Sequence, residues 1–265
     1  MLRLLWNSKS SMMAQQEKLD CISNNIANVN TNGYKKVSAN FKDLVYESLD
    51  RKGYPVTTDK NGKAILQNGT GVRIGEWTRN NTQGNLTATE LPTDLAIDGI
   101  GYFEVNQPDG SKAYTRSGNF LTDANDTIVD EAGNRLSIVD AQGNNINKPG
   151  GPYKFNRNNF NVDESGVVSI KQGNASTTVG KVQISNVIGD NSMISVGEGL
   201  FMPKPGSQVV QSTDYSIRQG FLELSNVDIA TEMTDMLITQ RAFQLSASTL
   251  KTADEMWQMA NNLRK

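Results

Sequence analysis

The sequence of 265 residues contains no histidine and only one cysteine, Cys21. Without histidine, the chain cannot use Ser-His-Asp or Cys-His catalysis, and it cannot build a histidine-containing zinc site. A single cysteine forms neither an internal disulfide nor a thiolate zinc cage. Cys21 lies on the apolar side of an expected helix, which predicts a small buried hydrophobic side chain.

Long apolar runs and a basic stripe are missing as well. No stretch of about 18 apolar residues is present that would span a bilayer. The N-terminal stretch MLRLLWNSKSSMMAQQEK has no apolar core and no small-residue cleavage site. We therefore expect neither membrane insertion nor a cleaved signal peptide. With a formal net charge of −2 and an isoelectric point near 5.4, the scattered Lys and Arg residues predict no nucleic-acid binding.

The first part of the chain has the periodicity of an amphipathic helix, from Leu2 to about Asn28. Its apolar residues form a heptad-like stripe, narrower than the apolar face of an ordinary globular helix. The stripe consists of residues seven apart and of two alternates, Leu5, Met12, Leu19 and Ile26 with Ile22 and Val29. Gly33 is expected to stop the helix, because glycine is favoured just beyond the last helical turn.

A second long helix is expected at the other end, because the residues after Ser225 include neither Pro nor Gly. Ser225 or Asn226 is the expected N-cap, and Asp228 lies near the positive helix end. The apolar stripe is Ile229, Met236, Phe243, Leu250 and Trp257, and the partner positions are mixed, Met233, Gln240, Ala247, Asp254 and Asn261. Such stripes often form plain core, but two narrow ones at opposite chain ends favour packing between copies.

Between the helices, from about 37 to 224, short alternating or β-branched runs are separated by Asp-Gly, Asn-Gly and Pro-Gly turns. Asp109-Gly110 predicts a β-hairpin. The polar, Gly-rich stretch from Asp50 to Thr70 is interpreted as an extended loop or a two-stranded ribbon. The predicted fold class is α+β. Long terminal helices form a coiled-coil-like domain (1–36 and 222–265), joined by an extended segment (37–80) to an inserted all-β domain (81–221).

Carboxylates are the remaining candidates for catalysis, as Asp94 with Asp98, or Asp123 with Asp126 and Asp130. The competing interpretation, turn and strand-end aspartates, is favoured. The stretch DANDTIVDEAGN resembles a calcium loop, but Ile128 stands where the sharp turn requires glycine. GNASTTVGKV and GTGVRIG have the wrong spacing for a phosphate loop and for a dinucleotide turn. We therefore expect no catalytic, cofactor-binding or metal-binding residues.

Three segments resemble the bacterial flagellar rod and hook protein family. MMAQQEKLDCISNNIANVNTNGYKKVSANFKDLVYESL is similar to its N-terminal signature, in which a helix ends in an Asn-rich turn. DLAIDGIGYFEV with GSKAYTRSGNF is similar to its central β motif, and QGFLELSNVDIATEMTDMLITQRAFQLSASTLKTADEMWQ to its C-terminal signature. Within the family, the total length and the loop before GTGVR resemble the subunit of the distal rod. Ser10-Ser11 departs from the Thr-Gly or Ser-Gly pair that is common there.

The resemblance implies a structural subunit of the flagellar basal body that is not an enzyme and needs no cofactor. Copies would stack helically into a tubular drive shaft, with the terminal helices around the export channel and the β domain outside. The implied partners are further copies, neighbouring rod and hook proteins, the flagellar type III export apparatus and the rings around the rod. Nucleic acid and membrane insertion are not implied. The expected subunit contacts are the two stripes and Met233.

The resemblance also assigns a family-signature turn, made of Asn24, Asn25, Asn28, Asn30, Thr31, Gly33 and Tyr34. Asn24, Asn25 and Asn28 are interpreted as uncharged hydrogen-bonding groups between neighbouring subunits. The terminal helices are expected to be largely disordered in the isolated monomer. Removal of the first 30 residues is expected to leave a folded β domain that cannot polymerise. The alternatives are a proximal rod or hook protein, a carboxylate-based cell-wall glycosidase, and a surface adhesin.

Overall fold

The computed structural model describes residues 2–48, 67–172, 175–189 and 192–263, so most of the predicted ribbon at 50–70 lies outside the described residues. The chain forms two compact units. The helical unit comprises Met1–Ala27, Val37–Thr78 and Asp228–Lys265, and the β unit comprises Asn28–Lys36 and Arg79–Val227. Helices at both chain ends thus flank a β-rich region, which confirms the predicted α+β class. The expected domain boundaries differ from these units, because 28–36 and 222–227 cluster with the β unit and 37–78 cluster with the helices.

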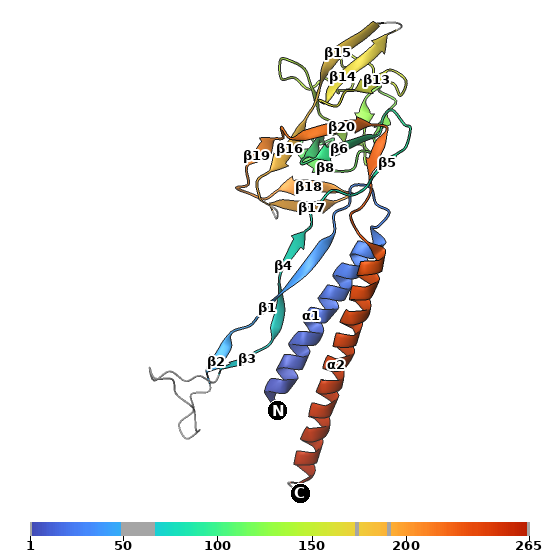
Figure 1. Ribbon diagram of the computed structural model, residues 1–265. Helices are drawn as coiled ribbons and strands as arrows, with labels where there is room; N and C mark the ends of the chain where they lie inside the picture. Colours follow the sequence, from blue (N-terminus) through green and yellow to red (C-terminus); the bar gives the residue numbers. More distant parts are fainter. Residues whose placement is uncertain (1, 49–66, 173–174, 190–191, 264–265) are drawn as a thin grey trace. The chain divides into compact units, whose positions relative to one another are not determined.

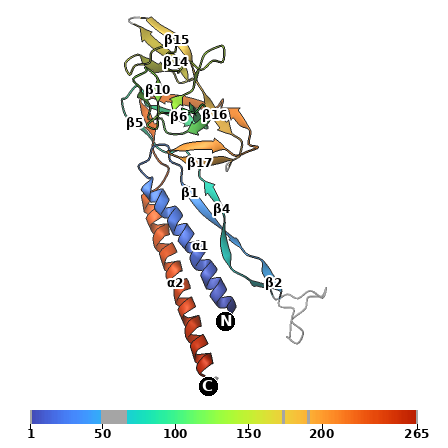
Figure 2. The same cartoon turned by 180° about the vertical axis from the view of Figure 1, so that it is seen from behind.

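The helical unit is built on α1 (Leu2–Ala27) and α2 (Ile229–Asn262), which lie side by side in Figures 1 and 2. The hydroxyl oxygens of Ser11 and Ser246 are 3.0 Å apart, and the Asn25 amide donates to the Glu232 carboxylate over 3.0 Å. The later residue on α1, Asn25, contacts the earlier residue on α2, Glu232, so the helices are antiparallel. Beside them, β1 (Val37–Asp43) pairs with β4 (Val72–Arg79), and β2 (Tyr46–Ser48) pairs with β3 (Gln67–Gly69).

The start of α2 differs from the prediction. Asp228 is the N-cap, because its carboxylate accepts the backbone N–H of Ala230 over 3.1 Å and the hydroxyl of Thr231 over 2.7 Å. The predicted caps, Ser225 and Asn226, were wrong. The Asn226 side chain is used inside the β unit instead, where its oxygen accepts the N–H of Lys36 over 2.7 Å.

The end of α1 at Ala27 is close to the predicted one, but Gly33 does not stop the helix. Gly33 lies beyond a turn in which Thr31 N–H donates to Asn28 O over 3.1 Å and Tyr34 N–H donates to Thr31 O over 3.3 Å. Its positive φ of 70° belongs to the β unit, where the segment from Asn28 to Lys36 is packed.

The β unit is made of short strands with the following bounds: β5 Leu86–Ala88, β6 Leu95–Gly99, β7 Tyr102–Asn106, β8 Lys112–Thr115, β9 Leu121–Thr122, β10 Ile128–Val129, β11 Arg135–Leu136, β12 Ile138–Val139, β13 Phe160–Val162, β14 Val167–Gln172, β15 Ala175–Val182, β16 Ile184–Val187, β17 Met193–Gly197, β18 Leu200–Pro203, β19 Val209–Gln211, β20 Tyr215–Gln219 and β21 Phe221–Glu223. The largest sheet has the order β17-β18-β8-β7-β11-β10-β9, and β16 joins β7 to β19. A second sheet has the order β12-β15-β14-β13, while β20 pairs with β6 and β21 with β5.

One turn design recurs along this part of the chain. At Asp130, the backbone N–H donates to Asn134 O over 2.9 Å, and Gly133 N–H donates back to Asp130 O over 3.1 Å. The same pair of bonds is formed in the turns that begin at Gln107, Asp123, Asp140 and Asp163. In each, the fourth residue has a positive φ, as in three-residue hairpin loops with a bulge. The first of these turns is the hairpin between β7 and β8, which confirms the Asp109-Gly110 prediction.

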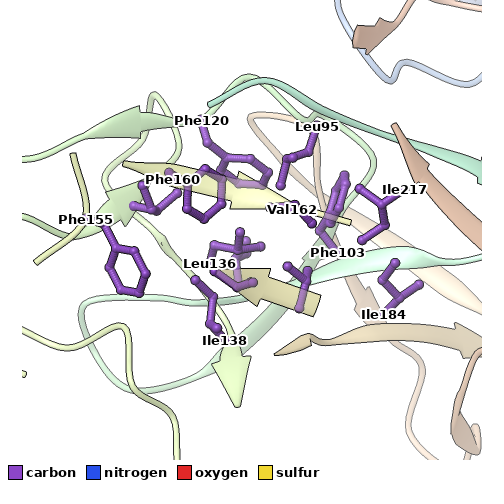
Figure 3. Packing of buried hydrophobic residues seen from close by; sticks show 14 of the residues in the cluster. Leu95, Phe103, Phe120, Leu136, Ile138, Phe155, Phe160, Val162, Ile184 and Ile217 are labelled. Atoms are coloured by element: carbon purple, nitrogen blue, oxygen red, sulfur yellow. The ribbon is translucent and has the colours of Figure 1, made fainter. Parts of the chain in front are cut away.

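The core of the β unit is apolar and fully enclosed. Phe103, Phe120 and Phe155 have no exposed surface, and the rings of Phe103 and Phe120 meet edge to face with centroids 5.4 Å apart. Figure 3 shows these rings among Leu95, Leu136, Ile138, Phe160, Val162, Ile184 and Ile217. Because both sheets supply these side chains, the β unit has a hydrophobic core of its own.

Candidate assembly surface and buried charge cluster

The side chains buried in α1 and α2 are mostly small or polar. They are Ser8, Ala14, Cys21, Ile22 and Asn25 on α1, with Glu232, Thr239 and Ala253 on α2. Only Ile22 among them is a large aliphatic residue. Burial of small side chains removes little apolar surface from water, so these fully buried positions contribute little to the stability of the helix pair.

Many large apolar side chains of the two helices are exposed. We call this set the exposed helix surface, and it consists of Leu4, Trp6 and Met13 on α1 with Ile229, Met233, Leu237, Ile238, Leu245, Met256, Trp257 and Met259 on α2. Leu245 retains 70% of its accessible surface and Met233 retains 54%. Apolar surface this extensive is typical of an interaction site.

The predicted stripe residues are distributed over three environments. Ile229, Met233 and Trp257 belong to the exposed helix surface, while Ile22 is buried. The others are half-buried, namely Leu5, Met12, Leu19, Ile26, Val29, Met236, Phe243 and Leu250. On α2 the buried positions are Glu232, Thr239 and Ala253, each one residue before the expected partner positions. The seven-residue stripes also miss Leu237, Ile238 and Leu245, which sequence reasoning would have found by plotting all large apolar residues around the helix.

Asn25 connects the helices to the first strand of the helical unit. Its amide donates to Val37 O over 2.8 Å, and its carbonyl accepts Val37 N–H over 3.1 Å. The Cys21 thiol, buried as predicted, donates to the same Val37 carbonyl over 3.1 Å. Asn25 therefore serves contacts inside its own unit rather than the expected role between subunits, whereas Asn24 is exposed on α1.

The β unit contains a buried cluster of three charged side chains, which we call the charge cluster. Glu223 accepts from Lys35 Nζ on one carboxylate oxygen and from Arg116 Nε on the other, both over 2.6 Å. All three side chains are at most 5% exposed. The backbone N–H of Gly84 also donates to Glu223, over 2.9 Å. The cluster thereby links three parts of the β unit: the segment 28–36 through Lys35, the end of β8 through Arg116, and β21 through Glu223.

Backbone carbonyl groups complete the charge cluster. Lys35 donates to Thr82 O over 2.9 Å, and Arg116 donates to Gly99 O over 2.7 Å, to Ile97 O over 3.1 Å and to Gly101 O. Burial lowers the pKa of the Lys35 ammonium group, and the negative charge of Glu223 opposes this shift. The bonds to Glu223 and to Thr82 O thus offset part of the desolvation of Lys35.

Gly33 contacts the backbone of two residues of the charge cluster, Glu223 and Arg116. Gly33 N–H donates to Glu223 O over 2.8 Å, and its Cα lies against the backbone of the strand end that carries Arg116. A Cβ atom at Gly33 would lie 2.6 Å from Arg116 C and 2.6 Å from Ser117 N. Only glycine fits there, because the obstructing atoms are backbone and φ is positive.

Replacing Gly33 by Ala is expected to lower the free energy of unfolding of the β unit by about 2–5 kcal/mol, from the left-handed backbone and the overpacking together. Gly110→Ala is the matched control, because Gly110 also has a positive φ but a Cβ there would meet nothing within 4 Å. We expect only about 1–2 kcal/mol for the control. Urea denaturation followed through the backbone amide NMR resonances of the β unit measures both. Equal losses for the two variants would contradict the close approach at Gly33.

The Asn-rich signature turn borders a polar pocket of about 600 Å³ in the β unit. Asn28, Asn30, Thr31 and Asn32 line one part of it, and Asp130, Glu131 and Glu198 are among its other lining residues. The Thr31 hydroxyl donates to the Asn28 side chain over 3.1 Å, and Tyr34 is half-buried. The signature is therefore a folded turn of the β unit, with amide groups left at its surface.

The candidate catalytic carboxylates do not share a cleft. Asp94 is buried and accepts the Thr89 hydroxyl over 2.6 Å, while Asp98 forms an exposed ion pair with Arg218 over 2.9 Å. Four residues of extended chain separate the Cα atoms of Asp94 and Asp98 by about 13 Å. The two carboxyl groups of a glycosidase pair are closer, at most about 9.5 Å apart. The carboxylate-pair hypothesis is therefore not supported by the geometry.

The other acidic motif forms hairpin turns. Asp123 accepts Ala124 N–H over 2.7 Å, and Asp130 accepts Ala132 N–H over 2.9 Å. The hydrogen bond from Asn125 keeps the pKa of Asp123 below its ordinary value. In the part of the chain that the structure describes, no group of three or more His, Cys, Asp or Glu side chains is placed to hold a metal ion. Nor is any described helix long and apolar enough to cross a membrane.

Comparison with known proteins gives three family matches along the chain. Residues 5–35 match "Flagella basal body rod protein", 96–186 match "Flagellar hook protein FlgE/F/G D1 domain", and 218–263 match "Flagellar basal body rod FlgEFG protein C-terminal". Lys35, Arg116 and Glu223 fall one in each match. The three matched regions therefore meet at the charge cluster.

Three full-length relatives carry the printed name "Flagellar basal-body rod protein FlgG". The protein from Borreliella burgdorferi is 36% identical over 275 residues, covering 100% of both chains. That from Buchnera aphidicola subsp. Acyrthosiphon pisum is 36% identical over 271 residues, covering 99% of this chain and 100% of the relative. That from Caulobacter vibrioides is 34% identical over 272 residues, with the same coverage.

Proposed function

Since the chain belongs to the family of flagellar basal-body rod and hook proteins, as a structural subunit of the distal rod, we propose that its copies polymerise through the paired terminal helices. The product is a helical, tubular drive shaft in the basal body, which transmits torque to the hook. The observation that carries this proposal is the exposed helix surface, whose large apolar side chains retain 38% to 70% of their accessible surface.

The energetics favour polymerisation through this surface. Full burial of a side chain such as Leu245 or Ile238 contributes roughly 1.5–3 kcal/mol relative to exposure. Several such residues buried per subunit offset the loss of rotational and translational freedom on association. A contact between different faces of identical subunits generates a helical filament when its rotation does not close a ring.

We also propose how the subunits are arranged within the shaft. The terminal helices pack in a coiled-coil-like manner within and between subunits, through the predicted stripe residues, and they surround the export channel. The β unit forms the outer layer. Neighbouring rod and hook proteins contact the two ends of the shaft, the ring proteins surround it, and the flagellar type III apparatus exports the subunit. Family membership supports these partners.

Electron microscopy of the purified full-length protein tests the proposal. We expect straight rods whose number rises with protein concentration, because nucleated helical growth needs a minimum concentration of subunits. A protein that stays monomeric at every concentration and ionic strength tried would contradict self-assembly of this chain.

Replacing Leu245 by Glu is expected to raise the critical concentration for rod formation at least about tenfold, because a charged group would have to be buried in the contact. Gln244→Glu is the matched control, since it adds the same charge beside Arg241, which already donates to Gln244 over 3.1 Å. Sedimentation of assembled protein measures both. If Gln244→Glu disrupts assembly as strongly as Leu245→Glu, net charge rather than the apolar surface controls assembly.

A further inference from the structure

A second pocket of the β unit, of about 430 Å³, lies beside the charge cluster. Its lining comes from the turn between β6 and β7, the end of β16 and the start of β17. Lys35 and Arg116 both line it, together with Tyr102, Asn81 and Asn186. No role proposed above uses this pocket.

Two buried cations in this pocket have hydrogen-bonding capacity left over. Lys35 has three N–H donors and uses two, on Glu223 and Thr82 O. Arg116 has five and uses four, on Glu223 and on three backbone carbonyls. Among the described residues, one donor of each side chain has no protein acceptor, and both side chains are at least 95% buried.

Counted over the residues that the structure describes, the formal charge at the pocket is positive. Lys35 and Arg116 contribute two positive charges and Glu223 one negative charge, which leaves +1 in the cluster. The described lining residues include no Asp or Glu. Burial raises the pKa of the Tyr102 hydroxyl, so this group stays neutral. A buried, uncompensated positive charge is complementary to an anionic group.

Four apolar side chains also line the pocket. Ile188 retains 63% of its accessible surface and Ile100 retains 60%, while Val187 and Met193 are buried. A ligand that enters would therefore place aliphatic carbon against these side chains and its charged end against Lys35 and Arg116.

We propose that this pocket binds a carboxylate carried on a short aliphatic stem, as an acidic side chain of a second copy presents it. A carboxylate offers four lone-pair sites, which suit the two free donors. The pocket itself is independent of the proposed function. Only the assignment of the carboxylate to a second copy rests on it.

The binding test uses sodium 4-methylpentanoate and the full chain below its assembly concentration. We expect saturable shifts of the backbone amide resonances of Gly99, Gly101 and Gly189, with a dissociation constant on the order of millimolar for so small a probe. The uncharged 4-methylpentanamide is the ligand control and should bind at least about tenfold more weakly.

Asn186→Asp is the decisive variant. The Asn186 oxygen accepts Val187 N–H over 2.9 Å, and aspartate keeps this acceptor while adding a negative charge to the pocket. Binding of 4-methylpentanoate should weaken at least about tenfold. Asn161→Asp makes the same change at an exposed position of β13 and should leave binding unchanged. Equal affinity for the acid and the amide, or unchanged binding in Asn186→Asp, would overturn the proposal.

Rod formation in the presence of the probe tests whether a second copy supplies the natural carboxylate. Saturating 4-methylpentanoate should slow rod formation, and the amide should not, if a second copy supplies the acid. Probe binding without an effect on assembly overturns the second copy as the source and leaves self-assembly intact. Tighter probe binding in Asp190→Asn also overturns it, because the competing carboxylate then belongs to this chain, next to Gly189 in the sequence.

Discussion

Replacing Glu223 by Gln is expected to lower the free energy of unfolding of the β unit by about 3–5 kcal/mol. The loss of one carboxylate leaves two cations, Lys35 and Arg116, buried without a counter-charge. Glutamine keeps the size and one acceptor, so the effect reports on charge rather than on a cavity. Urea denaturation of the full chain measures it, with backbone amide NMR resonances for the β unit, because α1 and α2 dominate the far-UV circular dichroism. Fluorescence of Trp6, Trp77 and Trp257 reports separately on the helical unit, which contains all three tryptophans.

Asp98→Asn is the matched control for this experiment. Asp98 also pairs with an arginine, Arg218, but both side chains are well exposed, so the expected loss is at most about 1 kcal/mol. A further variant, Glu223→Gln with Lys35→Met, removes one of the stranded cations and should recover part of the stability. If Glu223→Gln loses no more than the control does, the buried charge cluster is not what holds the ends of the β unit together.

The elements with a strong periodic signal were predictable from the sequence. Both helices were predicted, because apolar residues recur every seven positions and Pro and Gly are absent from the second. The hairpin at Asp109-Gly110 was predicted because its turn chemistry is local. The start of α2 was placed wrongly, since Ser225, Asn226 and Asp228 are all suitable caps, and the choice was made by the bond of Asn226 to Lys36 in the β unit.

The face that α2 buries within its unit was missed for a physical reason. Hydrophobicity identifies the large apolar side chains, and those of α2 are exposed or only half-buried. The buried face runs through Glu232, Thr239 and Ala253, which carry little hydrophobic signal. A seven-residue repeat shows that residues seven apart share one face of the helix. It identifies the buried face only when the most hydrophobic residues are the buried ones.

The charge cluster has no signal in the sequence at all. Glu223 is 188 residues from Lys35 and 107 from Arg116. In the run FLEL, Glu223 shares its strand face with Phe221, and this local pattern does not indicate that a carboxylate is buried with partners far away in the sequence. What the sequence does offer is indirect, since each of the three residues lies in one of the segments that carry the family resemblance.

Two different tasks are therefore separated within the N-terminal family match, residues 5–35. The helix up to Ala27 supplies apolar side chains to the exposed helix surface, including Trp6 and Met13. The segment after it supplies Gly33 and Lys35 to the β unit. A truncation that respects this boundary separates polymerisation from folding, whereas the expected removal of 30 residues cuts into the turn.

Removal of residues 1–27 is expected to abolish rod formation while the β unit keeps its free energy of unfolding within about 1 kcal/mol. The apolar core of the β unit, drawn in Figure 3, contains no residue from this segment, so its folding does not need α1. Without α1, α2 loses its antiparallel neighbour, and a single long amphipathic helix is marginal in water. Electron microscopy under conditions in which the full chain assembles measures the first effect, and urea denaturation measures the second.

Removal of residues 1–36 distinguishes the loss of α1 from the loss of the segment 28–36. We expect this deletion to form no rods either, but it also removes Gly33 and Lys35. The β unit should lose about 3 kcal/mol or more, because Glu223 then lacks one of its two cationic partners and Glu223 O lacks the Gly33 donor. Intact rods from either deletion would contradict assembly through the terminal helices. Equal stability of the two deletions would contradict the role of the segment 28–36 in the β unit, and would leave the assembly proposal standing.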